Sequence, residues 1–120
     1  MAADAALAAV SHLPHVIAFA AVQALIDQPG GADFMAVAGP GFRDFSRIAA
    51  SDPHVWRDIL LSNRDEVLRQ SRRFREALQQ LEQAIEQSDG VAIEAAVTRV
   101  RDARASWRSE EHMSELQSLR

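Results

Sequence analysis

The chain has 120 residues, 48% of them apolar, which is the size of one soluble domain with a core of its own. This length excludes a nucleotide-binding domain joined to a substrate domain, and the absence of cysteine excludes disulfides and thiolate chemistry. The net charge of −4 argues against nucleic acid or an anionic membrane as the main partner. The lack of cysteine also suits a reducing compartment, and we expect a cytoplasmic location.

The spacing of apolar residues, with no strand-like alternation, predicts an all-α fold. The first helix is expected over about residues 3–27, with a kink where Pro14 leaves the Val10 carbonyl without a donor. Its predicted inward residues are Leu7, Val10, Pro14, Ile17, Ala21, Ala24 and Ile26. Its most apolar stretch, from Leu13 to Ile26, is too short and too polar to span a bilayer.

Two short helices are expected next, at about residues 33–38 and 42–50, with the loop Gly39-Pro40-Gly41 between them. Arg47 lies on an otherwise apolar part of the second one, where a guanidinium needs a carboxylate or phosphate partner. It either forms an internal ion pair with Asp44 or Asp52 or binds an anionic ligand. The sequence leaves both alternatives open.

A long helix is predicted from the capping sequence Ser51-Asp52-Pro53 to about residue 88, followed by a last helix over about 91–107. One stripe follows the long helix at helical spacing: Trp56, Leu60, Asn63, Val67, Ser71, Phe74, Leu78, Leu81 and Ile85. The side chains of the last helix that are expected to point inward are Ile93, Val97, Val100 and Trp107. About 35 helical residues span about 52 Å, whereas a compact chain of this size is roughly 35 Å across. The overhang predicts a dimer, with an elongated monomeric hairpin as the alternative.

Two other groups of residues have a chemical and a structural interpretation. His12 and His15 share a helix face, but a zinc site needs further ligands, so structural histidines are favoured. A basic run predicts a solvated, salt-bridged face more than a nucleic-acid site: Arg69, Arg72, Arg73 and Arg75. The sequence contains no nucleophile elbow, metalloprotease motif or dinucleotide glycine pattern.

Two blocks resemble a known family. Residues 10–19 (VSHLPHVIAF) and residues 41–53 (GFRDFSRIAASDP), continuing through WRDI to Asn63-Arg64, carry the resemblance. In order and spacing they resemble the C-terminal helical dimerisation domain of the prephenate, arogenate and cyclohexadienyl dehydrogenases, over about residues 4–107. Ser46 stands where the family usually has threonine, and Ala3-Asp4 stands where it often has His-Asp.

The resemblance implies part of an NAD- or NADP-linked oxidoreductase of tyrosine biosynthesis, which oxidatively decarboxylates prephenate or arogenate. It implies four substrate-binding positions: Arg47 for a carboxylate, His15, Trp56 and Gly41. His12 and Asp44 match positions that support or gate the pocket. It implies no catalytic or cofactor-binding residue here, because the family carries both on an N-terminal Rossmann domain. The chain alone is therefore expected to be inactive and to bind no cofactor, with Met1 an internal start or a fragment boundary.

The sequence also leaves a second hypothesis for the function and two interpretations of the last residues. A stand-alone dimeric helical module, binding an aromatic amino acid through Arg47 and His15, is the second hypothesis for function. The domain is expected to cover residues 1–107. Residues 108–120 resemble a translated sequencing-adaptor read, and the alternative is a genuine polar, partly helical tail.

Overall fold

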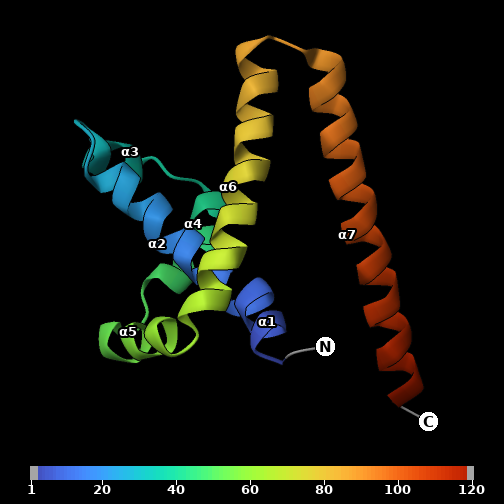
Figure 1. Cartoon of the computed structure of the whole chain (residues 1–120). Coiled ribbons are helices and arrows are strands. Elements are labelled where there is room, and N and C mark those ends of the chain that lie inside the picture. The colour runs from blue at the N-terminus through green and yellow to red at the C-terminus, as the bar shows by residue number, and fades with distance from the viewer. Residues whose placement is uncertain (1–2, 119–120) are drawn as a thin grey trace. The chain divides into compact units, whose positions relative to one another are not determined.

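The computed structural model describes the backbone of residues 3–118 and the side chains of residues 3–107, and this part is helical without strands (Figure 1). The all-α prediction is therefore confirmed. In chain order the elements are α1 (Ala3–Leu7), the π-helical turn η1 (Ala8–His12), α2 (Leu13–Ile26), α3 (Gly31–Ala36), α4 (Pro40–Ser46), the 3-10 turn η2 (Arg47–Ala49), α5 (Pro53–Ser62), α6 (Arg64–Glu86) and α7 (Gly90–Ser118). The chain divides into two compact units, with the boundary between Phe74 and Arg75.

The first helical run changes its hydrogen bonding just before Pro14. A proline has no N–H to donate to the carbonyl four residues back. In the preceding turn the Leu13 N–H donates to the Ala8 carbonyl, five residues back, which is a π-helical bond. The irregularity predicted from Pro14 therefore lies where expected, although the helix continues through it from α1 to α2.

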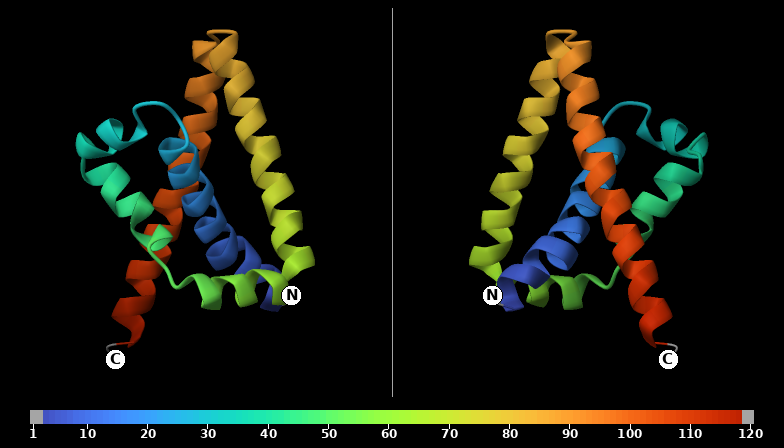
Figure 2. Two further views of the ribbon diagram at one scale, coloured as in Figure 1. Left: turned by 90° about the vertical axis from the view of Figure 1, so that its left-hand side faces the viewer. Right: turned by 90° about the vertical axis from the view of Figure 1, so that its right-hand side faces the viewer.

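In the first unit, α3, α4 and η2 pack against α2. The chain turns at Gly30, whose φ is +78°, a left-handed value that glycine adopts without strain. It passes through α3 and α4 and returns to α5 near the beginning of α2 (Figure 2). The predicted short helices are confirmed with shifted bounds: α3 begins at Gly31, α4 begins at Pro40, and residues from Arg47 to Ala49 form a separate 3-10 turn.

The single long helix predicted from Pro53 to residue 88 is wrong, because the chain bends at Asn63. The predicted start is confirmed, since the Asp52 carboxylate accepts from the N–H groups of His54 at 2.9 Å and Val55 at 3.0 Å. Asn63, however, has φ −115° and ψ 33°, outside the helical region, so α5 ends there and α6 begins at Arg64. The 23 residues of α6 span only about 35 Å. The overhang predicted for this helix is therefore not present in α6.

The buried face of the first helical run also differs from the prediction. Its buried residues are Ala8 and Ala18, whose small side chains let neighbouring helices approach closely. Several residues predicted to point inward are exposed instead: Leu7, Val10, Ala24 and Ile26. Among the described side chains Val67 is the one other buried apolar residue. Within residues 3–107, the chain therefore buries few of its apolar side chains.

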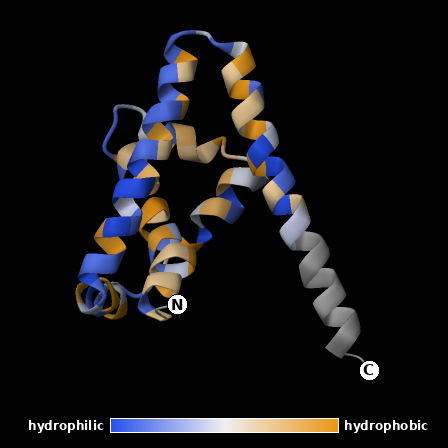
Figure 3. Ribbon diagram, turned by 45° about the vertical axis from the view of Figure 1, so that its right-hand side comes forward, coloured by the Kyte–Doolittle hydropathy of each residue, from blue (hydrophilic) through white to orange (hydrophobic). Residues whose placement is uncertain are grey.

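The last two helices also leave apolar side chains exposed, and apolar positions recur along both of them (Figure 3). The side chains of α6 and α7 that were predicted inward but are exposed are Leu78, Leu81, Ile85, Val97, Val100 and Trp107, while Ile93 is half-buried. Helix α7 runs to Ser118, past the predicted end at Trp107. The side chains of residues 108–120 lie outside the described ones, and the non-native origin of this tail stays a prediction.

The first helical run is longer than the apolar stretch seen in the sequence. From Ala3 to Ile26 it has 24 residues and includes an 18-residue window with a mean hydropathy of 1.7, which is long and apolar enough to cross a membrane by length and composition alone. The sequence-based exclusion, which rested on the shorter stretch from Leu13, is therefore too strong. A core helix of a soluble protein passes the same test.

Candidate functional site

An aromatic group joins the beginning of α2 to α5. The His15 ring stacks on the Trp56 indole with a centroid distance of 3.7 Å and an interplanar angle of 18°. His12 and Phe19 meet the same indole edge-on, each at 6.0 Å between centroids. Residues 12, 15 and 19 are three and four positions apart, so they lie on one helix face. We call His12, His15, Phe19 and Trp56 the histidine–tryptophan cluster.

Backbone and amide groups hold the two imidazoles in place. His15 Nδ1 lies 2.9 Å from the Ser11 carbonyl oxygen, one turn earlier on the same helix. His12 Nδ1 lies 3.3 Å from the Asn63 side-chain nitrogen, which also donates to the Asp4 carbonyl oxygen at 2.9 Å. The bend between α5 and α6 is therefore tied to both α1 and the cluster.

Arg47 begins η2, which packs against α2. Its side chain is exposed, and in the described part of the chain it has no ion pair or hydrogen bond. The internal ion pair that the sequence left open is therefore not formed: Asp52 caps α5, and Asp44 is exposed and unpaired. The Arg47 guanidinium is left to solvent or to a ligand.

Gly41 and Asp44 lie on α4, which also packs against α2. Nothing lies within 4 Å of a Cβ built on Gly41, so packing within this chain does not require glycine there. Over residues 3–107, no hydrogen bond, ion pair or ring contact links Arg47, Gly41 or Asp44 to the histidine–tryptophan cluster. The structure thus brings His12, His15 and Trp56 together and places the other three candidates on neighbouring elements.

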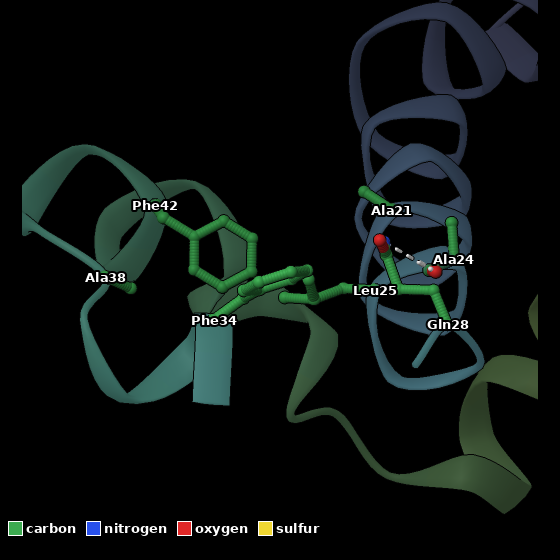
Figure 4. A pocket seen from close by; sticks show the side chains of 7 residues that line it. All are labelled: Ala21, Ala24, Leu25, Gln28, Phe34, Ala38 and Phe42. Atoms are coloured by element: carbon green, nitrogen blue, oxygen red, sulfur yellow. Dashed lines mark hydrogen bonds between the residues drawn. The ribbon is translucent and has the colours of Figure 1, made fainter. Parts of the chain in front are cut away.

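A separate apolar pocket of about 420 Å³ lies between α2, α3 and α4 (Figure 4). Leu25, Phe34 and Phe42 line it together with alanines, and Gln28 supplies the polar group. The Gln28 side-chain nitrogen already donates to the Ala24 carbonyl oxygen at 3.2 Å. The pocket shares no residue with the histidine–tryptophan cluster.

The other candidate chemistries find no supporting geometry. Within the described residues, no group of three or more His, Asp or Glu side chains is placed to hold a metal ion. In the basic run, Arg69 pairs with Glu66 at 2.6 Å while Arg72 and Arg73 are exposed. This arrangement agrees with the solvated, salt-bridged face that the sequence predicts for this run.

Sequence reasoning missed the part played by Asn63 and Phe19. Asn63 was visible as one of two polar residues, with Ser71, in a mostly apolar stripe, and a polar residue at such a position usually forms a hydrogen bond. Phe19 was visible at one further helical turn from His15. Neither signal identifies the partner residue. Asn63 contacts Asp4 and His12, which are 59 and 51 positions away, and Phe19 contacts Trp56 on α5.

Residues 2–98 match the family model described as "Prephenate dehydrogenase, dimerization domain". The chain is 37% identical over 89 residues to the cyclohexadienyl dehydrogenase of Zymomonas mobilis, covering 72% of this chain and 30% of that protein. It is 33% identical over 91 residues to the prephenate dehydrogenase of Bacillus subtilis, covering 72% and 24%. It therefore spans about a quarter to a third of the length of these curated relatives.

Solved structures agree. The prephenate dehydrogenase of Aquifex aeolicus, in complex with hydroxyphenyl propionate and NAD⁺, is similar with a TM-score of 0.79 and 36% identity, over 86% of this chain and 36% of that one. The Synechocystis arogenate dehydrogenase is similar with a TM-score of 0.80 and 25% identity, over 87% and 38%. The match over most of the chain, in sequence and in fold, shows that this chain belongs to the prephenate dehydrogenase family and carries its dimerization domain.

Proposed function

We propose that this chain forms a homodimer and supplies part of the substrate pocket of a prephenate or arogenate dehydrogenase, an NAD- or NADP-linked oxidoreductase. The observation that carries the proposal is the unpaired Arg47 on a turn packed against α2, the helix that holds His15 on Trp56. Hydroxyphenyl propionate, the molecule in the related complex, has a carboxylate at one end. A guanidinium binds a carboxylate through two parallel hydrogen bonds.

Each candidate residue then has a distinct task. Arg47 binds the substrate carboxylate, while the His15–Trp56 stack forms a flat wall for the ring. Gly41 leaves open space beside α4, where its backbone can approach a substrate. We assign support of this wall to His12, which meets Trp56 edge-on, and we assign the pocket entrance to Asp44, which is exposed on α4.

The dinucleotide cofactor does not fit the residues of this chain. A dinucleotide-binding turn connects a strand to a helix through a G-x-G-x-x-G pattern. The described residues form no strand, and the glycines of the sequence do not have that spacing. We therefore assign the cofactor and the catalytic histidine to a Rossmann domain outside these 120 residues, and we propose that the chain alone is inactive.

The proposed dimer has support beyond the family match. Large apolar side chains stay exposed in one copy, among them Val10 at 75%, Val91 at 81% and Val100 at 68%. Val10 lies in the first unit and Val91 and Val100 in the second, and apolar surface left exposed on a unit is what a second copy would cover. Light scattering at micromolar concentration should give twice the chain mass, and a monomer throughout would contradict the homodimer.

We propose a cytoplasmic location as well. The run from Ala3 to Ile26 carries His12 and His15, which contact Asn63 and Trp56 from α5 and the bend after it. A helix that crossed a bilayer would lose these contacts and place two imidazoles among lipid tails. The protein should stay in the soluble fraction after the membranes of expressing cells are sedimented.

The test of the pocket is a titration of the chain with hydroxyphenyl propionate, followed by the NMR signals of the Trp56 indole and the His15 ring. Removing a charged hydrogen-bonding partner costs about 1.5–3 kcal/mol, so Arg47→Ala should weaken binding by about 10- to 100-fold. The amide of the same ligand, which lacks the negative charge, should bind as weakly to the unmodified chain.

Arg64→Ala is the matched control, because Arg64 is exposed in the same unit and its ion pair among the described residues is with Asp65, at 2.9 Å. It should leave the titration unchanged. No shift at Trp56 or His15 with millimolar ligand, or equal binding by the Arg47→Ala variant, would remove Arg47 from the pocket. Tyrosine binding tighter than hydroxyphenyl propionate would instead favour the module that binds an aromatic amino acid.

A further inference from the structure

Asn63 stands at the bend between α5 and α6, and its backbone serves both helices. Its N–H donates to the Ile59 carbonyl at 3.2 Å, which closes α5, and its carbonyl accepts from the Val67 N–H at 3.0 Å, which opens α6. The side chain is half-buried and leaves this bend toward the first helical run. The backbone from which the Asn63 side chain extends is therefore held by hydrogen bonds to both helices.

The hydrogen bonds of this amide determine which way it faces. The Asp4 carbonyl can only accept, so the group 2.9 Å from it must be the Asn63 NH₂ rather than the amide oxygen. The same nitrogen has a second hydrogen, and His12 Nδ1 lies 3.3 Å away. His12 Nδ1 therefore accepts, and the proton of the neutral imidazole is on Nε2.

His15 is held in the opposite form. Its Nδ1 lies 2.9 Å from the Ser11 carbonyl oxygen, which also only accepts, so the proton of the neutral ring is on Nδ1. The Nε2 of His15 then has a free lone pair, while the Nε2 of His12 carries a hydrogen. Over residues 3–107 neither Nε2 has a hydrogen-bond partner in the structure.

We propose that Asn63 is a positioning residue that fixes His12 as the Nε2–H tautomer, so that the two imidazoles packed on Trp56 offer one donor and one acceptor. This rests on the proposed function insofar as the histidine–tryptophan cluster is a substrate pocket. Such a pair suits a neutral group that both donates and accepts, such as a hydroxyl, whereas a carboxylate is matched by Arg47.

The first experiment reads the tautomers directly, without ligand, in the complete chain. A long-range ¹H–¹⁵N spectrum of the neutral histidine rings should show His12 protonated at Nε2 and His15 protonated at Nδ1. His12 protonated at Nδ1, or an equal mixture of both forms, would overturn the proposal. This result needs neither a variant nor a substrate.

The second experiment replaces the donor by an acceptor of the same shape. Asn63→Asp keeps the size of the side chain, but its carboxylate accepts from His12 Nδ1 and should move the His12 proton to Nδ1. The spectrum of His15 should not change, because its partner is the Ser11 carbonyl. Gln70→Glu is the matched control, as it adds the same charge at a half-buried position of α6.

An unchanged His12 spectrum in the Asn63→Asp variant would refute a positioning role for Asn63. If the variant does not fold, Asn63→Ser, which removes the amide NH₂ and both of its hydrogen bonds without adding charge, should give a mixture of His12 tautomers. Affinity for hydroxyphenyl propionate should fall about ten-fold in either variant, the effect of one misdirected hydrogen bond. Correct tautomers without any ligand binding would sink the proposed function and leave the role of Asn63 intact.

Discussion

Gly31 is the residue whose substitution should disturb the first unit most. It is buried where α3 begins, against the carboxyl end of α2. A Cβ added to it would overlap the Leu25 carbonyl oxygen and lie 3.0 Å from the Leu25 carbonyl carbon and 3.3 Å from the Ile26 Cα. These are backbone atoms, so no side-chain rotation relieves the overlap, and α3 must move away from α2.

The expected cost of Gly31→Ala follows from this geometry. Overpacking in a well-packed site costs about 1–3 kcal/mol, and a backbone obstacle puts the substitution at about 3 kcal/mol. For a domain of this size that lowers Tm by roughly 10 °C. Because α3 leads to α4 and η2, the packing of η2, which begins at Arg47, against α2 should also be disturbed.

Two other glycines make the comparison specific. Gly30→Ala should cost only about 1 kcal/mol, since the φ of +78° is strained for alanine but the nearest atom, in the Phe34 ring, is 3.6 Å away. Gly41→Ala should cost nothing or stabilise α4 slightly, because nothing lies within 4 Å and alanine is the better helix former.

The assay is thermal and urea denaturation followed by circular dichroism, at one protein concentration for all variants because a dimer's Tm depends on concentration. The predicted order of destabilisation is Gly31→Ala, then Gly30→Ala, then Gly41→Ala. A Gly31→Ala variant as stable as the unmodified chain would show that α3 does not lie as close to α2 as described.

Two further substitutions test how helices end and begin. Asp52→Ala removes the acceptor for two N–H groups of α5 and should destabilise the protein by about 1 kcal/mol. Asp52→Asn keeps an acceptor oxygen and should retain most of the stability of the unmodified chain. Equal stability of the unmodified chain and both variants would refute the cap. Ser88 has φ 52° in a motif that ends α6, with the Asp89 N–H on the Ala84 carbonyl and the Ser88 N–H on the Ile85 carbonyl. Ser88→Gly should therefore raise the free energy of unfolding by about 1 kcal/mol in the same denaturation assay, and a loss of stability would contradict that ending.

The sequence by itself determined the helical class and several element boundaries. Asp52 before Pro53 fixes the start of α5 because a carboxylate cap and a proline at the first helical position act locally. Pro14 located the irregular turn for the same reason, since a missing N–H affects the adjacent turn. The two sequence blocks around His15 and Arg47 also identified the family, because they keep both residue types and order.

The tertiary structure decided what depends on distant partners. The helical spacing of apolar residues continues through Asn63, so periodicity predicts one long helix. The bend instead falls at Asn63, whose side-chain amide contacts Asp4 and His12, more than 50 positions away. Ala8 and Ala18 are buried instead of Leu7 and Val10 because close helix packing selects small side chains. Arg47 had acidic neighbours in sequence, but Asp52 caps α5 instead, and over residues 3–107 the Arg47 guanidinium has no ion pair.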